Sequence, residues 1–157
     1  MRRITTQLGL MAFLFIMTLG SSYGQRYKTA VGLRLSGEYG INLSQRIGDR
    51  TTLQVNHEGG FLSGDKTSSV HYVGHRGIFQ GGLNVFAGVG VNGYYRTAKE
   101  DLPSTRGLRP GVILGTEATL GRINLAFDWS PTFNLRKDAD KFNSTVGFTV
   151  RYVFVKN

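Results

Sequence analysis

The sequence contains no cysteine, only three prolines, and no apolar run of membrane-helix length. Without cysteine, the chain has neither disulfides nor a site for lipid attachment at a processed N-terminus. A transmembrane helix needs roughly 18 or more consecutive apolar residues, and the apolar stretch from Leu8 to Leu19 is shorter than that. These absences exclude a disulfide-stabilised domain, a lipoprotein and a helical membrane protein.

The N-terminal segment predicts a secretory signal peptide over residues 1–24. Arg2 and Arg3 precede the apolar stretch, and small residues follow at the positions that a signal peptidase reads, so we expect cleavage before Gln25. The expected mature chain, residues 25–157, has the size of one domain. Removing the two arginines lowers the formal charge from +9 to +7, which still suggests contact with an anionic partner such as lipid head groups.

Apolar and polar residues alternate with a period of two along the mature chain, which is typical of β-strands. The clearest example begins at Leu83, where every second residue through Val91 is apolar. The faces of the fourth strand stay unassigned, because each mixes polar and apolar residues: His71, Val73 and His75 share one face, and Tyr72, Gly74 and Arg76 share the other. We expect eight strands, at 28–36, 41–47, 53–61, 69–78, 83–92, 112–120, 123–130 and 146–154.

The connections between these strands alternate between short and long, as in transmembrane barrels. Tight turns are expected near Asp49, Gly81 and Gly121, and a polar excursion over 97–109 is the longest loop. Pro131 is expected to bend or end the seventh strand. An open sheet edge in lipid leaves backbone groups unsatisfied, so the first strand should pair with the eighth. The predicted fold is an all-β, eight-stranded antiparallel up-and-down transmembrane β-barrel, with both termini in the periplasm.

Alternation alone does not say which face is outside, but two features favour apolar side chains facing lipid. First, aromatic residues concentrate near strand ends, as two interfacial belts would require. The expected belts comprise Tyr39, Phe61, Tyr94, Tyr95, Trp129 and Phe133 toward the loops, and Tyr27, Phe79, Tyr152 and Phe154 toward the turns.

Second, charges of both signs lie at mid-strand on the polar face, where an internal ion-pair network would place them. The interior of an eight-stranded barrel is just wide enough to be filled by side chains, so a diffusion pore is not expected. The expected interior network comprises Arg34, Arg46, Glu58, Glu117, Asp128 and Arg151.

The final strand, Gly147 to Phe154, resembles the C-terminal recognition signal of outer-membrane barrels, with alternating hydrophobic positions and a late aromatic. Together with the segments 32–35 and 124–131, it is similar to small outer-membrane β-barrel proteins with OmpA-like or OmpX-like eight-stranded domains. The resemblance covers nearly all the mature chain and specifies a barrel rather than an activity. It implies insertion into a Gram-negative outer membrane by the barrel assembly machinery.

Two motifs suggest cofactors and are better explained structurally. The glycine pattern from Gly88 to Gly93 matches a dinucleotide fingerprint, but no helix follows to hold a pyrophosphate. His71 and His75 would lie roughly 13 Å apart along a strand at about 3.3 Å per residue, too far to share a metal ion. We therefore expect no cofactor, no metal and no nucleic-acid partner.

The expected role is structural or a surface interaction, by a monomer in contact with outer-membrane lipids and lipopolysaccharide. Candidate contacts with lipopolysaccharide phosphates are Arg96, Lys99, Arg106 and Arg109.

Two alternatives stay open. The first is a soluble, exported, lipocalin-like binding barrel. The second is a lipid A modifying enzyme with Ser69 as nucleophile, His71 as base and Glu58 as orienter. Ser69 and His71 would be roughly 7 Å apart along their strand, so enzymatic activity is not expected.

Overall fold

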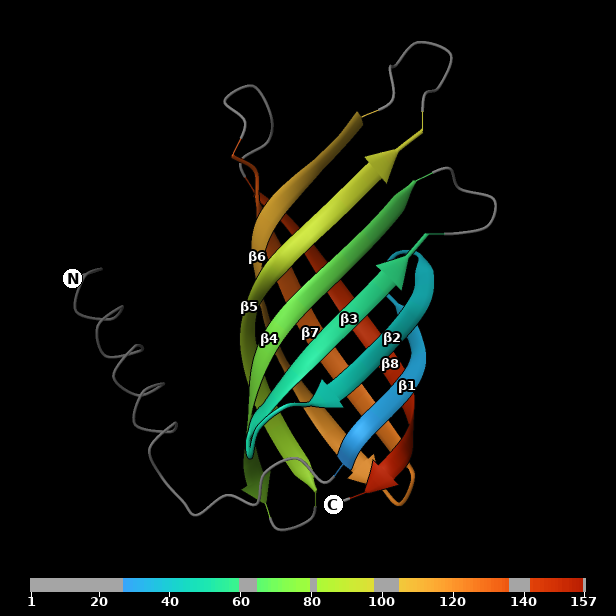
Figure 1. Ribbon diagram of the computed structural model, residues 1–157, viewed down its shortest axis with the longest axis vertical. Coiled ribbons are helices and arrows are strands. Elements are labelled where there is room, and N and C mark those ends of the chain that lie inside the picture. The colour runs from blue at the N-terminus through green and yellow to red at the C-terminus, as the bar shows by residue number, and fades with distance from the viewer. Residues whose placement is uncertain (1–26, 60–64, 80–81, 98–104, 136–141, 157) are drawn as a thin grey trace, which may run out of the picture.

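The computed structural model describes residues 27–59, 65–79, 82–97, 105–135 and 142–156, without the side chains of Phe79 and Lys156. These residues form one closed barrel in which every strand pairs antiparallel with its neighbours in sequence, and β1 pairs with β8 (Figure 1). The predicted eight-stranded antiparallel barrel is confirmed. The strands are β1 Tyr27–Leu35, β2 Tyr39–Arg46, β3 Thr51–Glu58, β4 Lys66–Phe79, β5 Leu83–Arg96, β6 Thr105–Leu120, β7 Ile123–Phe133 and β8 Phe142–Lys156.

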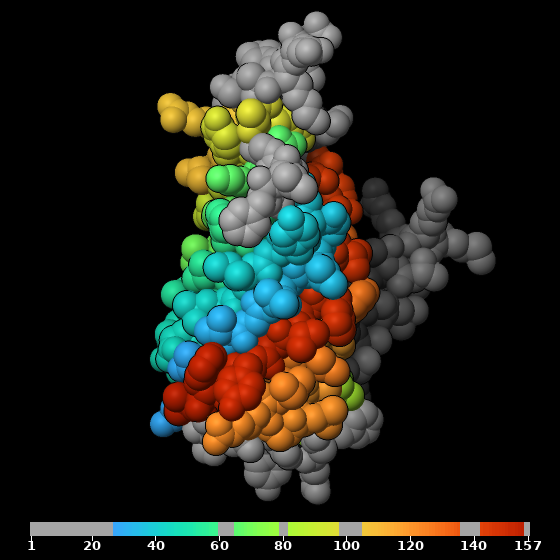
Figure 2. All heavy atoms as spheres, turned by 90° about the vertical axis from the view of Figure 1, so that its right-hand side faces the viewer, coloured from blue at the N-terminus to red at the C-terminus, as the bar shows by residue number. Residues whose placement is uncertain are grey.

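The closing contact joins β1 to β8 over nearly the whole length of β1. Its register runs from Tyr27 opposite Lys156 to Leu35 opposite Phe148. The first residue of β1 and the last residue of β8 therefore lie at the same rim of the barrel. Figure 2 shows β1, in blue, directly against β8, in red, so the wall is continuous on this face. The expected signal peptide lies outside the described residues. Among the described residues, no helix is long and apolar enough to span a membrane.

The barrel has an uneven mouth at the long-loop rim, because β5 and β6 extend beyond the other strands (Figure 1). Residues 105–109, predicted to belong to a loop, are instead the first residues of β6. They pair with the end of β5, with Arg96 opposite Thr105 and Asn92 opposite Arg109. Backbone pairing with a long neighbouring strand therefore gives this polar segment its extended conformation. The composition of the segment alone does not indicate that conformation.

Pro131 does not end β7, which continues to Phe133. The proline lies opposite Ser144 in the intact pairing with β8. On the other edge, the pairing with β6 joins Gly111 to Thr132 and Leu114 to Trp129, with no pair between them. Since proline has no N–H to donate, the interruption is confined to one edge and the other edge keeps the strand extended.

The outer surface is apolar and the interior is polar. Among the described residues, 29 large hydrophobic side chains are exposed, whereas only seven hydrophobic residues are buried. In β5, for example, Val89 is 61% exposed, whereas Phe86, three residues earlier and on the inward face, is buried. In β4, whose faces the sequence leaves open, His71, Val73 and His75 face inward and Tyr72 faces outward. This arrangement is the one that the sequence predicts for a membrane barrel.

Most aromatic side chains that the structure describes are exposed near the strand ends, but two predicted belt residues are not. Tyr27 is completely buried, because register shifts at the start of β1 break the alternation and turn this residue inward. Tyr94 is half-buried on the inward face that it shares with Asn92. Phe61 lies outside the described residues, as does the side chain of Phe79. The exposed ring of Phe142, which the sequence analysis did not include, contacts the rings of Trp129 and Phe133 at centroid distances of 6.5 and 5.9 Å.

Candidate functional site: the barrel interior and its mouth

The lower half of the interior is organised around Glu117 of β6, whose side chain is fully buried. A carboxylate removed from water needs several hydrogen bonds or a counter-charge to offset its lost hydration. Glu117 has both, since its two oxygens lie within bonding distance of five other side chains. These are Tyr27 Oη at 2.9 Å, His75 Nδ1 at 3.0 Å, Asn84 Nδ2 at 3.1 Å, Asn124 Nδ2 at 3.3 Å and Arg151 Nη1 at 3.4 Å.

Arg151 extends this network across the barrel through a series of asparagines. Its Nη1 donates to Asn124 Oδ1 at 2.7 Å, and its Nε donates to Asn42 Oδ1. Asn42 donates in turn to Asn56, which donates to Ser69 Oγ at 3.0 Å. The hydrogen-bonded chain thus links β8 to β2, β3 and β4 and holds the opposite walls together. The sequence pattern does not mark these asparagines as members of a network, although each lies at an inward position of its strand.

A second cluster surrounds Arg34 of β1, nearer the mouth. Its two terminal nitrogens donate to the two carboxylate oxygens of Asp128, one of them at 2.8 Å. Its Nε donates to Glu58, whose other oxygen accepts a hydrogen bond from Ser36. Ser130 Oγ completes the cluster by donating to Asp128 at 2.8 Å. Arg34 and Asp128 are almost completely buried, whereas the side chain of Glu58 is 16% exposed.

The structure therefore distributes the six charged residues expected in the interior over three places. Arg34, Glu58 and Asp128 form the upper cluster, and Glu117 and Arg151 belong to the lower network. Arg46 contacts neither, because its guanidinium donates to the backbone carbonyls of Gly48 and Asp49 at 2.8 and 2.7 Å. It stabilises the tight turn between β2 and β3, close to its own position in the chain.

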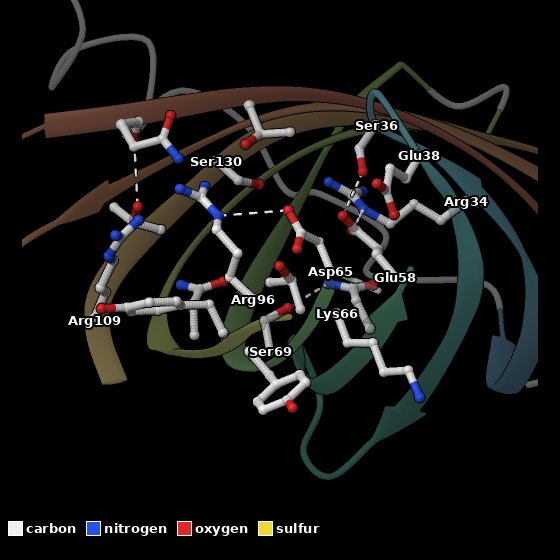
Figure 3. A pocket seen from close by; sticks show the side chains of 18 of the residues that line it. Arg34, Ser36, Glu38, Glu58, Asp65, Lys66, Ser69, Arg96, Arg109 and Ser130 are labelled. Atoms are coloured by element: carbon white, nitrogen blue, oxygen red, sulfur yellow. Dashed lines mark hydrogen bonds and ion pairs between the residues drawn. The ribbon is translucent and has the colours of Figure 1, made fainter. Parts of the chain in front are cut away.

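Above Arg34 the mouth contains a pocket of about 250 Å³ (Figure 3). Its floor includes Arg34 and His71, both about 1% exposed. The lining is almost entirely polar and comes from seven strands, all except β2, and from two of the connections between strands. It comprises Arg34, Ser36, Glu38, Asn56, Glu58, Asp65, Lys66, Thr67, Ser69, His71, Asn92, Tyr94, Tyr95, Arg96, Arg109, Ser130, Thr132, Asn143 and Thr145.

The four residues expected to contact lipopolysaccharide do not form one surface. Arg109 faces the pocket, with its guanidinium 4.0 Å from the centroid of the Tyr94 ring. Arg96 lies at the rim and forms an ion pair with Asp65 at 3.4 Å. Arg106 is exposed on the outward face of β6, and Lys99 lies outside the described residues.

The three residues weighed as a catalytic triad all line the mouth pocket but do not form a hydrogen-bonded relay. Ser69 Oγ accepts from Asn56, and Glu58 is engaged by Arg34 and Ser36. Neither ring nitrogen of His71 has a hydrogen-bond partner among the described residues.

A different histidine–serine pair lies on the outer face, between His57 Nδ1 and Ser68 Oγ at 2.8 Å. No described carboxylate forms an ion pair with this histidine. Within the described ranges, no group of three or more histidine and acidic side chains is placed to hold a metal ion.

Comparisons with known proteins support the fold. No protein-family model matches the sequence, and no curated protein matches it. Among solved structures, the chain is similar to the N-terminal β-barrel domain of OprF from Pseudomonas aeruginosa, with a TM-score of 0.62 and 14% sequence identity. The alignment covers 83% of this chain and 99% of that domain. At this identity the likeness shows a shared barrel fold and carries no function with it.

Proposed function

We propose that this chain is an integral outer-membrane β-barrel with a structural or surface-interaction role, and that it is not a diffusion porin. The observation that carries the proposal is the orientation of the two faces: hydrophobic side chains cover the outside, and paired charges occupy the inside. A transmembrane barrel requires this arrangement, because its outer surface faces hydrocarbon and its interior does not. Closure between β1 and β8 also leaves no open sheet edge for lipid to desolvate.

The alternative of a soluble, lipocalin-like barrel fits these faces poorly. Such a barrel would bury its leucines and valines and expose its ionised groups. Here Leu33 and Val89 are 69% and 61% exposed, while Arg34 and Asp128 are buried. Monomeric soluble proteins rarely expose contiguous apolar patches larger than a few hundred square ångströms.

The packing of the interior supports a role other than diffusion. An eight-stranded barrel encloses only enough room for its own side chains. Below the mouth pocket, that room is occupied by the Glu117 network and by a small apolar cluster that includes Phe86 and Ile113. An aqueous path through the barrel would require these buried groups to move apart.

We propose no enzymatic activity, because the arrangement of serine, histidine and carboxylate that acyl transfer needs is not assembled in the described residues. Ser69 and His71 are not hydrogen-bonded to each other, and the bonded pair His57 and Ser68 has no described acidic partner. The lipid A modifying alternative predicts an altered lipid A mass when the gene is expressed. An alanine substitution at either histidine would test it.

The location and partners follow from the same proposal. Export behind the expected signal peptide, cleaved before Gln25, would deliver the chain to the periplasm. The alternating final strand would direct the barrel assembly machinery to insert it. The protein would then contact outer-membrane lipids and lipopolysaccharide as a monomer, with the long connections outside the cell.

Fractionation of expressing cells tests the proposal. The full chain should sediment with the outer membrane, should need detergent for extraction, and should migrate differently on gels before and after boiling. Vesicles containing the folded protein should exclude small sugars to the same degree as empty vesicles. Extraction in plain buffer would overturn the membrane assignment, and rapid sugar entry would overturn the assignment as a non-porin.

A further inference from the structure

We infer that the mouth of the barrel contains a binding site for a small solute that carries an oxyanion, a carboxylate or phosphate group, held by Arg109 and Asn92. This inference goes beyond the proposed function. The experiment that tests it can succeed or fail whatever the outcome for the proposed function. Both residues line the mouth pocket from neighbouring positions, since Asn92 of β5 lies directly opposite Arg109 of β6. Each also has a donor nitrogen without a partner among the described residues.

Arg109 is the arginine of the pocket that has no ion pair among the described residues. Arg34 is bound by two carboxylates and Arg96 by one, but no described carboxylate forms an ion pair with Arg109. Its Nε is buried and without a described hydrogen-bond partner. A guanidinium in this state is a ready anchor for an oxyanion, which it can bind through two parallel hydrogen bonds.

Two glycines of β6 give the residues around Arg109 their positions. A β-carbon at Gly107 would lie 2.7 Å from Tyr94 Oη, so the glycine makes room for the ring on which the guanidinium rests. A β-carbon at Gly111 would lie 2.6 Å from Asn92 Nδ2, so this glycine makes room for the asparagine amide. The two glycines thus make room for the Tyr94 ring and the Asn92 amide on either side of Arg109 along β6.

Further unpaired polar atoms lie deeper in the same part of the barrel. His71 has no described partner for either ring nitrogen, and the same is true of Gln54 Nε2, although both residues are about 1% exposed. The strand register brings Gln54 opposite His71 and Ser69 opposite Asn92. Buried groups of this kind are costly unless they are hydrogen-bonded. Since His71 lines the pocket, a polar ligand that reaches its ring supplies a partner that the described residues do not.

The distribution of charge in the pocket indicates what kind of solute fits. The acidic lining residues are Glu38 in the connection between β1 and β2, Glu58 at the end of β3 and Asp65 in the connection after β3. The lining residues of β5 to β8 contain no carboxylate. Figure 3 shows Arg109 on one side of the pocket and Glu38 and Glu58 on the other. An oxyanion is favoured beside Arg109, and a second anionic group would meet the acidic wall.

The size of the pocket sets a further limit. Pockets for drug-sized ligands occupy about 300–1,000 Å³, and this pocket of about 250 Å³ is smaller. We therefore assign it to a small dissolved anion and not to the head group of a lipid. Arg109 also faces the inside of the barrel, whereas Arg106 on the same strand faces outward, where lipid would lie.

The experiment is an NMR titration of the folded full-length barrel in non-ionic detergent, following the side-chain amide of Asn92. We expect added acetate or inorganic phosphate to shift this signal saturably. Arg109→Gln should weaken binding by about tenfold or more, because a charged hydrogen-bonding partner is lost. Arg106→Gln removes the same charge from the outward face of the same strand and should change the affinity less than about twofold.

Two further arms distinguish the remaining outcomes. Asn92→Asp places a carboxylate opposite Arg109 and should abolish binding. In this variant the titration follows the Nε–H signal of Arg109 instead, so the test stays decisive if Arg109→Gln does not fold. Added lipopolysaccharide should leave the Asn92 signal unchanged. The inference is overturned if neither anion shifts the signal, if both arginine variants lose affinity equally, or if lipopolysaccharide alone produces the shift.

Discussion

The guanidinium of Arg34 reaches the carboxylate of Asp128 by passing over Gly147, the residue of β8 that lies between their two strands. Gly147 pairs with Asp128 across β7 and β8, and a β-carbon on it would lie 2.6 Å from Arg34 Nη1. The hydrogen at this position is thus what allows β1 to be tied to β7 across the strand that closes the barrel.

Gly147→Ala should therefore destabilise the barrel. The new methyl group displaces the guanidinium from Asp128, and disrupting a buried ion pair costs up to about 3–5 kcal/mol. The free energy of unfolding, measured by denaturant titration in lipid vesicles, should fall by up to this amount. Gly93→Ala is the matched control, because its β-carbon would meet Leu108 Cδ2 at an ordinary 3.4 Å. Equal stability of the two variants would contradict the assignment.

Glu117→Gln should be among the most destabilising isosteric changes in the interior. Glutamine keeps the shape but removes the negative charge beside Arg151 and turns one acceptor oxygen into a donor facing other donors. We expect a loss of about 3–5 kcal/mol, as for a buried charge left without its partner.

Glu58→Gln is the control for this substitution. Its side chain is partly exposed at the mouth, and Arg34 retains Asp128 when Glu58 is neutralised. The loss of stability, measured by the same denaturant titration, should be clearly smaller than for Glu117→Gln. A larger loss for Glu58→Gln would mean that the lower network is not what holds the interior together.

Val89→Arg tests which solvent surrounds the barrel. The valine lies near the middle of β5 and faces outward. An arginine near the bilayer midplane costs about 2–4 kcal/mol, falling to about 0–1 kcal/mol near the interface. Folding into vesicles should therefore be strongly impaired by Val89→Arg and little affected by Leu108→Arg, which lies close to the rim. In a water-soluble barrel, Val89→Arg would instead leave stability unchanged and improve solubility.

The strand pattern was largely predictable because alternation is a local property. Every second residue from Leu83 to Val91 is apolar, and these residues do face outward in β5. The same reasoning failed at Tyr27, because the register shifts that turn it inward come from pairing with β8, more than 100 residues away. It also failed at residues 105–109, whose extended conformation depends on the length of β5.

The interior contacts were less predictable, because they depend on register between strands. Arg34 and Arg46 have similar positions in their sequence patterns, yet one binds two carboxylates and the other binds a turn. Nothing local separates them. The asparagines around Arg151 were overlooked for the same reason, since an inward asparagine is recognisable as a network member only when its partners across the barrel are known.

Trp129 offers a direct measurement of the orientation on which the membrane assignment depends. It is the only tryptophan in the chain, its side chain faces outward, and its ring contacts Phe142 near the loop end of β7. Lipids brominated near the head group should quench its fluorescence more strongly than lipids brominated near the chain ends, because interfacial aromatic residues lie at head-group depth.

A second variant turns this measurement into a comparison of depths. In a protein carrying both Trp129→Phe and Val89→Trp, the new indole replaces an outward residue near mid-strand, so the deeper bromines should become the stronger quenchers. A water-soluble quencher should have little effect on either protein. Strong quenching from water with none from brominated lipid would mean that the apolar face is not in the bilayer.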